Sequence, residues 1–308
     1  MQHSFAVSVT VALAISLAAP GAWTARPVER LPTPEEIRKI EDAMPPGPPV
    51  KPAKPRKVLV WGHAWSHLPT PFGSAMMEVM AKKTGAFEAV VSEDPAIFLP
   101  GSLRAFDAIV MNNIHETDPF LPAEFAKMSK DEKEAATQRD RAIKQSILDF
   151  VAGGKGVVGI HAATAAFQSW PEYGAMMGGY YGGHITEDVW IKLEDPGSPL
   201  CAPFGGKPFQ IHDEIYTFQG PHTRENLRIL LSLDLDRMKD PGKRPDKDYA
   251  VSWVRRYGKG RVFYCSLGHM PETYWNPTFL RHVLAGVQFA TGDLEADATP
   301  SAKAGKEK

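Results

Sequence analysis

Histidines follow four of the apolar runs that predict strands in this sequence. They are His63, His115, His161 and His269. In open α/β sheets, ligands bind in the crevice beyond the carboxyl ends of the strands. A solvated loop position would explain any one of these histidines, but it explains the set of four less well. We therefore expect the four imidazoles to line one functional cleft, where imidazole can act as acid, base, metal ligand or neutral donor.

His161 has the most informative surroundings of the four. It lies in the stretch GGKGVVGIHAAT, which predicts a buried strand running into a tight turn between small residues. This is the local pattern of a nucleophile elbow, which pushes one side chain into the cleft above a sheet. We expect His161 to be a catalytic acid or base. The alternative is a histidine packed beneath the loop.

A second group of polar residues lies in the run Ile211–Tyr216. If this run is a strand, His212, Glu214 and Tyr216 point to the opposite face from Asp213. A carboxylate close to an imidazole is what a general base or an oriented metal ligand requires. We expect Glu214 and His269 to assist His161 in catalysis, and His212 and Tyr216 to contact substrate. A surface ladder of ion pairs is the alternative.

Loop aromatics and further histidines complete the predicted substrate site. Trp170 and Tyr173 are expected to stack on the apolar face of a sugar or another planar ligand, unless they pack under the loops. The glycine-rich stretch 178–183 lacks the spacing and the lysine of a phosphate loop. It predicts a flexible turn that brings His184 near the cleft. His63 and His115 are expected to contact substrate as well.

The elements that must position these residues follow from the apolar pattern. Strand and helix alternate at first, which predicts a mainly parallel sheet flanked by helices. An antiparallel extension is expected over residues 186–256. The predicted strands are 57–61, 88–92, 107–112, 156–160, 189–193, 209–218, 227–231, 251–255 and 260–267. The predicted helices are 73–84, 131–152 and 279–291.

The ends of the chain differ in composition from its middle. Residues 1–25 contain no charged side chain, and the apolar run Val7–Ala19 is shorter than the roughly 20 residues of a membrane span. They predict a cleaved signal peptide and a periplasmic or secreted protein, the alternatives being a membrane anchor or an untranslocated tail. We expect residues 26–56 to be a Pro-rich linker with one short helix at 34–43. Residues 57–292 should form one domain, and residues 293–308 a disordered tail.

Charge and cysteine content exclude several classes of function. With 35 basic and 36 acidic residues and no basic block, the chain has no electrostatic footprint for nucleic acid. Cys201 and Cys265 are its two cysteines, and they form no C-x-x-C pair. The chain is therefore neither a disulfide scaffold nor a cysteine-based zinc protein, and we expect both thiols to be buried and inert.

Four segments together resemble the ThuA-like (trehalose utilisation) family over residues 57–292. They are KVLVWGHAWSH, GKGVVGIHAATAAFQSWPEYGAMMGGYYGGH, HDEIYTF and VSWVRRYGKGRVFYCSLGHMPETYWNPTF. The resemblance implies a class I glutamine amidotransferase-like, flavodoxin-like fold. It also implies a link to sugar catabolism and to dehydrogenases that make 3-keto sugars. The amidotransferase cysteine position holds His161, so glutaminase activity is not expected.

Three functions are compatible with these residues. The leading hypothesis is an enzyme that acts on a glycoside or its 3-keto derivative by hydrolysis, elimination or isomerisation, with His161, Glu214 and His269 as acid/base groups. The second is a divalent-metal site, most suitably zinc, although no H-E-x-x-H signature is present. The third is a non-catalytic sugar-binding module. We expect no stable membrane insertion. The sequence is compatible with a homo-oligomer.

Overall fold

Five short apolar runs form the parallel half of one sheet in the computed structural model, which describes residues 30–62, 67–238, 244 and 246–304. These strands are β1 (Lys57–Trp61), β2 (Glu88–Ser92), β3 (Ala108–Asn112), β4 (Gly156–Ile160) and β9 (Gly260–Cys265). Their order across the sheet is β2-β1-β3-β4-β9, and each neighbouring pair is parallel. This is the strand order of the flavodoxin-like fold. Every residue of β3 and β4 is buried, as expected where helices cover both faces.

Four longer strands extend the same sheet in antiparallel fashion, giving nine strands in all. From β9 outward they are β8 (Ala250–Tyr257), β7 (Arg228–Leu233), β5 (Tyr180–Leu193) and β6 (Phe209–Gln219). The extension begins earlier than residue 186. Gly183 pairs with Thr217 of β6 after a bulge at Tyr181, so much of the glycine-rich stretch is strand rather than the flexible turn we expected.

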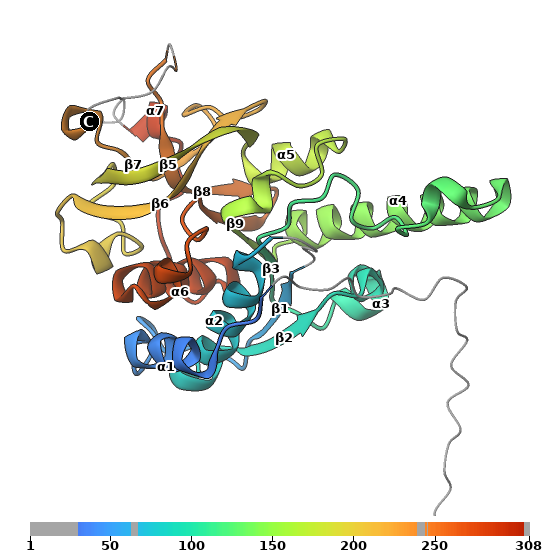
Figure 1. Ribbon diagram of the computed structural model, residues 1–308, viewed down its shortest axis with the longest axis horizontal. Coiled ribbons are helices and arrows are strands. Elements are labelled where there is room, and N and C mark those ends of the chain that lie inside the picture. The colour runs from blue at the N-terminus through green and yellow to red at the C-terminus, as the bar shows by residue number, and fades with distance from the viewer. Residues whose placement is uncertain (1–29, 63–66, 239–243, 245, 305–308) are drawn as a thin grey trace, which may run out of the picture.

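Helices lie on both faces of the parallel half of the sheet (Figure 1). One hydrophobic cluster joins α1 (Pro34–Ala43), α2 (Pro69–Thr84) and α6 (Pro277–Thr291) to residues such as Val58 and Val110. The other joins α3 (Pro100–Leu103), α4 (Lys130–Ala152) and α5 (Pro171–Met177) to residues such as Leu59 and Ile109. Alternation of side chains along each strand supplies both clusters from the same strands.

Shorter helical segments connect these elements. They are η1 (Pro95–Phe98), η2 (Phe125–Lys127), η3 (His161–Thr164), η4 (Ala202–Phe204), η5 (Leu235–Arg237), η6 (Pro271–Trp275) and α7 (Ser301–Ala304). Local signals in the sequence set several helix ends. Ser129 and Glu132 form a capping box at the start of α4, and Gly85 ends α2 in the left-handed conformation.

The described part of the Pro-rich segment packs on the domain, which differs from our expectation of a linker. The short helix α1 forms as predicted, with a capping box between Thr33 and Glu36. Its Ile40 is fully buried against the first cluster. Farther along, Arg56 is hydrogen-bonded to Asp293 at 2.6 and 2.8 Å. Specific apolar and ionic anchors therefore hold a segment whose composition alone indicates disorder.

Residues 293–304 are also packed, contrary to the expected disordered tail. Leu294 is buried, and the Ile229 amide donates a hydrogen bond to Ser301 Oγ at 2.9 Å. As in the Pro-rich segment, specific contacts hold residues whose composition alone indicates disorder. The predicted signal peptide lies outside the described residues. Within the described part of the chain, no helix combines the length and apolarity that a membrane crossing needs.

Candidate functional site

The carboxyl ends of the parallel strands lie level with one another, which explains why the histidines that follow them meet. Asn112 of β3 pairs with Ile160 of β4, and Ile160 pairs with Cys265 of β9. Loops that leave these strand ends therefore begin at the same edge of the sheet. This is the edge at which open α/β proteins bind ligands.

His161 follows directly after β4 and is fully buried. Its backbone φ is +44°, the left-handed region, so the chain turns sharply from strand into η3. Its Nδ1 lies 2.7 Å from the carbonyl oxygen of Ser266. Because a carbonyl can only accept, Nδ1 carries a hydrogen and donates it to Ser266, which leaves Nε2 on the other side of the ring. Nε2 has no hydrogen-bond partner.

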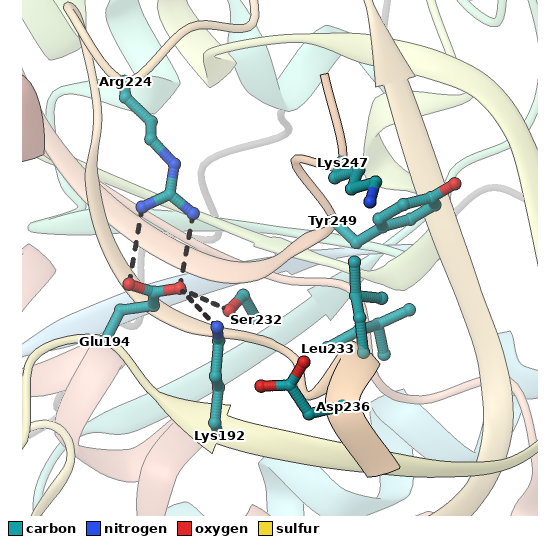
Figure 2. Close-up of a pocket in the computed structure, with 9 residues that line it drawn as sticks. Lys192, Glu194, Arg224, Ser232, Leu233, Asp236, Lys247 and Tyr249 are labelled. Carbon is teal, nitrogen blue, oxygen red and sulfur yellow. Dashed lines mark hydrogen bonds and ion pairs between the residues drawn. The ribbon is translucent and has the colours of Figure 1, made fainter. Parts of the chain in front are cut away.

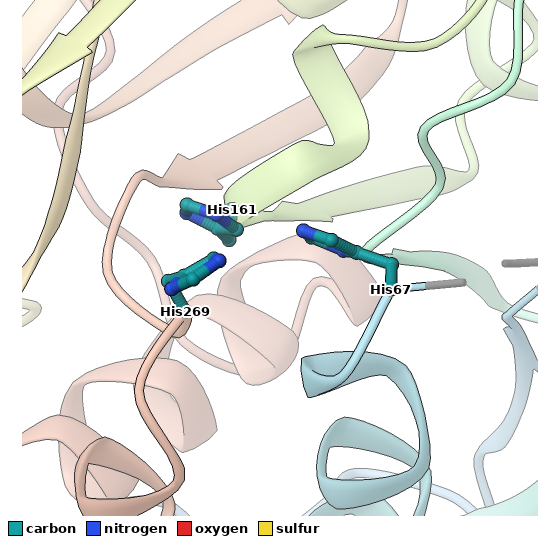
Figure 3. Close-up of side chains that lie close together, drawn as sticks. All are labelled: His67, His161 and His269. Atoms are coloured by element: carbon teal, nitrogen blue, oxygen red, sulfur yellow. The ribbon is translucent and has the colours of Figure 1, made fainter. Parts of the chain in front are cut away.

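Two further histidines face His161. His67, His161 and His269 each offer one ring nitrogen, and these three nitrogens lie within 4.8 Å of one another (Figure 3). The rings of His67 and His161 are stacked, with centroids 5.6 Å apart and planes 8° apart. The His269 ring lies 5.2 Å from that of His161. We refer to these three residues as the histidine cluster.

His67 was not among the residues we predicted. Its signal was present in the sequence, because the segment KVLVWGHAWSH carries a second histidine after β1. We assigned the role to His63, which lies outside the described residues. In the structure, His67 lies just ahead of α2 and close to His161 and His269. Loop geometry of this kind cannot be obtained from the spacing of residues alone.

Glu214 of β6 faces the histidine cluster from the antiparallel extension. Its carboxylate oxygens lie 3.6 Å from His161 Nε2 and 3.9 Å from His269 Nε2. They also lie 3.7 Å from His184 Nε2. Burial opposes ionisation of Glu214, but the imidazoles of these three histidines lower its pKa to about 2. Glu214 is therefore a carboxylate near neutral pH.

The pKa values of two histidines in the cluster are lowered, which favours the neutral form of the ring. Burial and the neighbouring rings of His161, His115 and His269 lower the pKa of His67 to about 3. Burial and the His161 ring also lower the pKa of His269. Neutral imidazole keeps a lone pair available as a base or as a metal ligand.

Asp213 positions the loop that carries His269. It is fully buried and points away from Glu214, as strand alternation predicts. Its carboxylate accepts hydrogen bonds from the backbone amides of Gly268, His269 and Met270 at 2.8 to 3.0 Å. It also accepts one from Thr273 Oγ1 at 2.9 Å. From the sequence, we recognised Asp213 only as the residue on the other face of the strand from Glu214. Its role in holding the loop of His269 was missed.

Three other predicted residues border the cluster. The exposed His115 stacks on His67 with ring centroids 5.4 Å apart. The side chain of His184 is 46% exposed, and its Nδ1 lies 2.8 Å from Tyr181 Oη. The ring of Tyr216 packs against His161 at 4.3 Å, and burial raises its hydroxyl pKa. The group thus runs from the buried His161 to exposed imidazoles, so a small molecule can approach it from solvent.

The remaining predicted contacts lie elsewhere. His212 is exposed on β6 and pairs with Asp188 at 3.1 Å, which is the surface ion pair that we considered as the alternative. Trp170 and Tyr173 are buried in the second hydrophobic cluster, where both rings pack on Phe167. Both rings are therefore packed under the loop, which is the alternative that we considered, and are not presented for stacking on a sugar. Trp170 is the N-cap of α5, and Tyr173 lies in its first turn. The apolar side of this helix is buried.

A separate pocket of about 420 Å³ lies on the antiparallel extension (Figure 2). Its polar groups largely satisfy one another, because Glu194 binds Arg224, Ser232 and Lys192. No residue of the histidine cluster lines it.

The two cysteines belong neither to the histidine cluster nor to the lining of this pocket. Both are buried and unpaired, and burial raises the pKa of each thiol to about 12.

Strand order and site together define an α/β protein of flavodoxin-like topology, with an imidazole and carboxylate cluster at the ends of its parallel strands. The chain belongs to the ThuA family (trehalose utilisation), whose profile matches residues 57–290. Membership confirms the predicted resemblance and connects the protein with carbohydrate utilisation. Among curated proteins, none matches the chain.

Two solved structures share this fold. A ThuA-like protein from Bacteroides uniformis is 19% identical, with a TM-score of 0.58 over 83% of this chain and 100% of that one. A ThuA-like protein from Parabacteroides merdae is 17% identical, with a TM-score of 0.53 over 80% of this chain and 93% of that one. At these identities the likeness concerns the fold. It confirms the predicted mixed sheet with a parallel core flanked by helices.

Proposed function

We propose that this protein is an enzyme of carbohydrate catabolism that acts on a 3-keto glycoside by moving a proton next to the keto group. The observation that carries this proposal is the contact between His161 and Glu214. A fully buried imidazole nitrogen without a hydrogen-bond partner lies 3.6 Å from a carboxylate with a strongly lowered pKa. Paired bases of this kind are suited to proton transfer from and to a substrate.

The chemistry of a 3-keto sugar makes this pair sufficient. A base removes the proton from C2, and the electron pair of that bond moves to the carbonyl oxygen of C3. Return of the proton gives an isomer. If the pair instead re-forms the C3 carbonyl and shifts to C1–C2, the bond from C1 to the glycosidic oxygen breaks, and that oxygen takes up a proton. Addition of water to the unsaturated product completes a hydrolysis.

Residues around the pair have roles consistent with this reaction. His161 Nε2 is the base of the proposal, and Glu214 stabilises the imidazolium that forms. His269, whose ring lies 5.2 Å from that of His161, would hydrogen-bond the developing enolate oxygen. The exposed His115 and His184 would contact sugar hydroxyls.

Hydrogen exchange at carbon tests the proposal directly. We would incubate the protein with trehalose oxidised at C3 in D₂O and follow loss of the C2 proton signal by NMR, with unoxidised trehalose beside it. We expect exchange or cleavage of the keto sugar only. Glu214→Gln should slow it by about 10²-fold or more, the contribution of a positioned proton-transfer group. Asp188→Asn, which changes an exposed carboxylate on neighbouring β5, should leave the rate unchanged.

A binding module without catalysis predicts a different result. In that case the keto sugar would bind and shift the melting temperature, yet its C2 proton would persist in the presence of the folded wild-type protein. That outcome would refute the enzymatic proposal.

A further inference from the structure

We propose that His67, His161 and His269 form a binding site for one divalent transition-metal ion of the zinc class, with Glu214 beside it. Binding of the ion does not depend on the proposed reaction, whereas its part in that reaction rests on the proposed function. Imidazole nitrogens are common ligands of zinc, copper, iron and nickel. Three protein ligands with space for a fourth are the usual composition of a catalytic zinc site.

The distances are compatible with such an ion after a small closure of the site. Nitrogens bound to one tetrahedral zinc ion at about 2.0–2.1 Å lie roughly 3.4 Å apart. The three nitrogens of the histidine cluster all lie within 4.8 Å of one another. A movement of about 1 Å per ring satisfies the geometry. His67 and His269 can supply it because both lie on loops, whereas His161 is fully buried.

Unpartnered nitrogens are the independent observation that points to a ligand. His67 Nδ1, His161 Nε2 and His269 Nδ1 are all buried, and none has a hydrogen-bond partner. A buried polar atom left without a partner costs about 1–3 kcal/mol, and each residue of the histidine cluster carries one such nitrogen, so a group that satisfies them would stabilise the site. His161 Nε2 belongs to a side chain with no exposed surface, and its ring lies 5.6 Å from that of His67 and 5.2 Å from that of His269.

The surroundings of His161 have the arrangement found around metal-bound imidazoles. Ligating histidines donate their other ring N–H to a carboxylate or a backbone carbonyl, which fixes the tautomer and the direction of the ring. His161 Nδ1 makes this bond to the Ser266 carbonyl at 2.7 Å. Asp213 holds the backbone of His269 through its own amide and through both neighbouring amides. Two of the three ligands are thus positioned by the protein itself.

Charge at the site favours a cation. The three rings are uncharged when they act as ligands, and Glu214 adds a negative charge within 3.9 Å of two of them. The ion pairs that Glu214 forms in the described part of the chain are all with imidazoles. With the ion bound, the lone pair of His161 Nε2 would be taken up as a ligand, so Glu214 and not His161 would accept the proton, and the ion would polarise a sugar carbonyl or hydroxyl as a Lewis acid.

Cobalt titration tests the site without reference to turnover. The full chain, prepared without a polyhistidine tag, would be stripped with a chelator and titrated with Co²⁺ while its visible absorption is recorded. Zn²⁺ content after dialysis would be measured in parallel. We expect one equivalent of either ion, and an increase in melting temperature with Zn²⁺. His67→Ala and His269→Ala should weaken Co²⁺ binding by at least about 10-fold.

His212→Ala is the matched control, because it removes an exposed histidine that pairs with Asp188 outside the cluster. It should bind Co²⁺ like the wild type. Absence of a Co²⁺ spectrum in the folded wild-type chain, or equal loss in the control, would overturn the metal site. If a cluster variant fails to fold, the wild-type titration and the Zn²⁺-dependent melting shift still decide.

The two proposals fail in distinguishable ways. Co²⁺ binding without any exchange at C2 of the keto sugar supports the metal site and refutes the proposed reaction. Exchange that continues at full rate in stripped protein with no Co²⁺ uptake refutes the metal site and supports proton transfer by His161 and Glu214 alone.

Discussion

His161 combines backbone strain with an unpartnered nitrogen. A residue other than glycine held at positive φ costs on the order of 1–3 kcal/mol, and such residues concentrate at functional sites. Here the strain places the ring between Tyr216 and the other two histidines, with its Nε2 facing Glu214. A histidine retained only for packing would gain nothing from an unsatisfied nitrogen in a buried position.

We expect His161→Gln to lower turnover of the keto sugar by about 10²–10⁴-fold, because an amide can hydrogen-bond but cannot shuttle a proton. Its free energy of unfolding should fall by less than the ~2–5 kcal/mol that a core deletion costs. Turnover and thermal unfolding would be measured on the same preparations, with His212→Gln as the control. A well-folded, fully active variant would remove His161 from the catalytic residues.

Asp213 acts on the site through the loop that it holds. Asp213→Ala would leave the amides of Gly268, His269 and Met270 without their acceptor. Each such donor costs about 1–3 kcal/mol when it stays buried, so we expect a loss of several kcal/mol in the free energy of unfolding. Urea unfolding measures it, with Asp188→Ala as the exposed comparison. An unchanged stability would show that the loop is held by other contacts.

At the scale of elements, the segment before β1 is tied to the segment after α6. Arg56 precedes β1 and Asp293 follows α6, and their side chains are 10% and 0% exposed. The Ala53 amide donates a further hydrogen bond to Asp293 at 3.0 Å. This link helps to explain why segments with disorder-prone composition are packed.

Removing one partner of this pair should be costly. We expect Asp293→Asn to lower the free energy of unfolding by about 1.5–3 kcal/mol near pH 7, because the nearly buried Arg56 loses its closest carboxylate and keeps only Asp107, at 3.5 Å. Lys39 pairs with the exposed Glu35, so Glu35→Gln provides a matched change of at most about 0.5 kcal/mol. Equal effects of the two substitutions would contradict a buried ion pair.

The same pair predicts a pH dependence. Burial opposes ionisation, but hydrogen bonds from Arg56 and the Ala53 amide hold the pKa of Asp293 below its usual value. Around pH 4 the unfolded chain therefore binds more protons here than the folded chain, and stability rises with pH. The difference between wild type and Asp293→Asn should persist above about pH 4 and shrink as the pH falls below it. Urea unfolding at a series of pH values measures this difference.

Close packing of α6 on β4 limits what residue 156 can be. A Cβ at Gly156 would lie 2.2 Å from the carbonyl oxygen of Ala290, which is backbone and cannot move aside cheaply. We expect Gly156→Ala to destabilise the protein by about 1–3 kcal/mol through overpacking. Gly47→Ala is the control, since nothing lies within 4 Å of its added carbon. Thermal unfolding distinguishes them, and a neutral Gly156→Ala would mean that α6 adapts.

At the scale of the molecule, the two halves of the nine-stranded sheet contribute different residues to the site. The parallel half supplies His161 and His269 from level strand ends, and the antiparallel half brings Glu214 against them. The pair of His161 and Glu214 therefore needs both halves of the sheet. The histidine cluster lies at the carboxyl ends of the parallel strands, and Glu214 reaches it from β6, the outermost antiparallel strand.

The compartment is a separate prediction for the whole protein. We propose export, because residues 1–25 are uncharged and carry the apolar run of a signal peptide. The mature chain should begin near residues 22–26. Amino-terminal sequencing of protein from separated cell fractions measures this. Recovery of an intact Met1 from the cytosol would contradict it.

The sequence determined the local structure of this protein well. The runs 57–61, 88–92 and 156–160 are strands with the predicted bounds, and α1 and the end of α2 at Gly85 also follow their signals. These features depend on neighbours along the chain, namely apolar periodicity, caps and glycine. The turn at His161 and the opposite directions of Asp213 and Glu214 have the same local origin.

Only the tertiary structure decided which residues meet. His67 joined the cluster and His212 stayed on the surface because loop path and strand position, not spacing, set their distances. Trp170 and Tyr173 are core residues because α5 folds back onto the sheet. The packed ends likewise depend on contacts between residues far apart in the sequence. Long-range contacts of this kind carry no signal in the pattern of a single segment, which is why the site needed the fold.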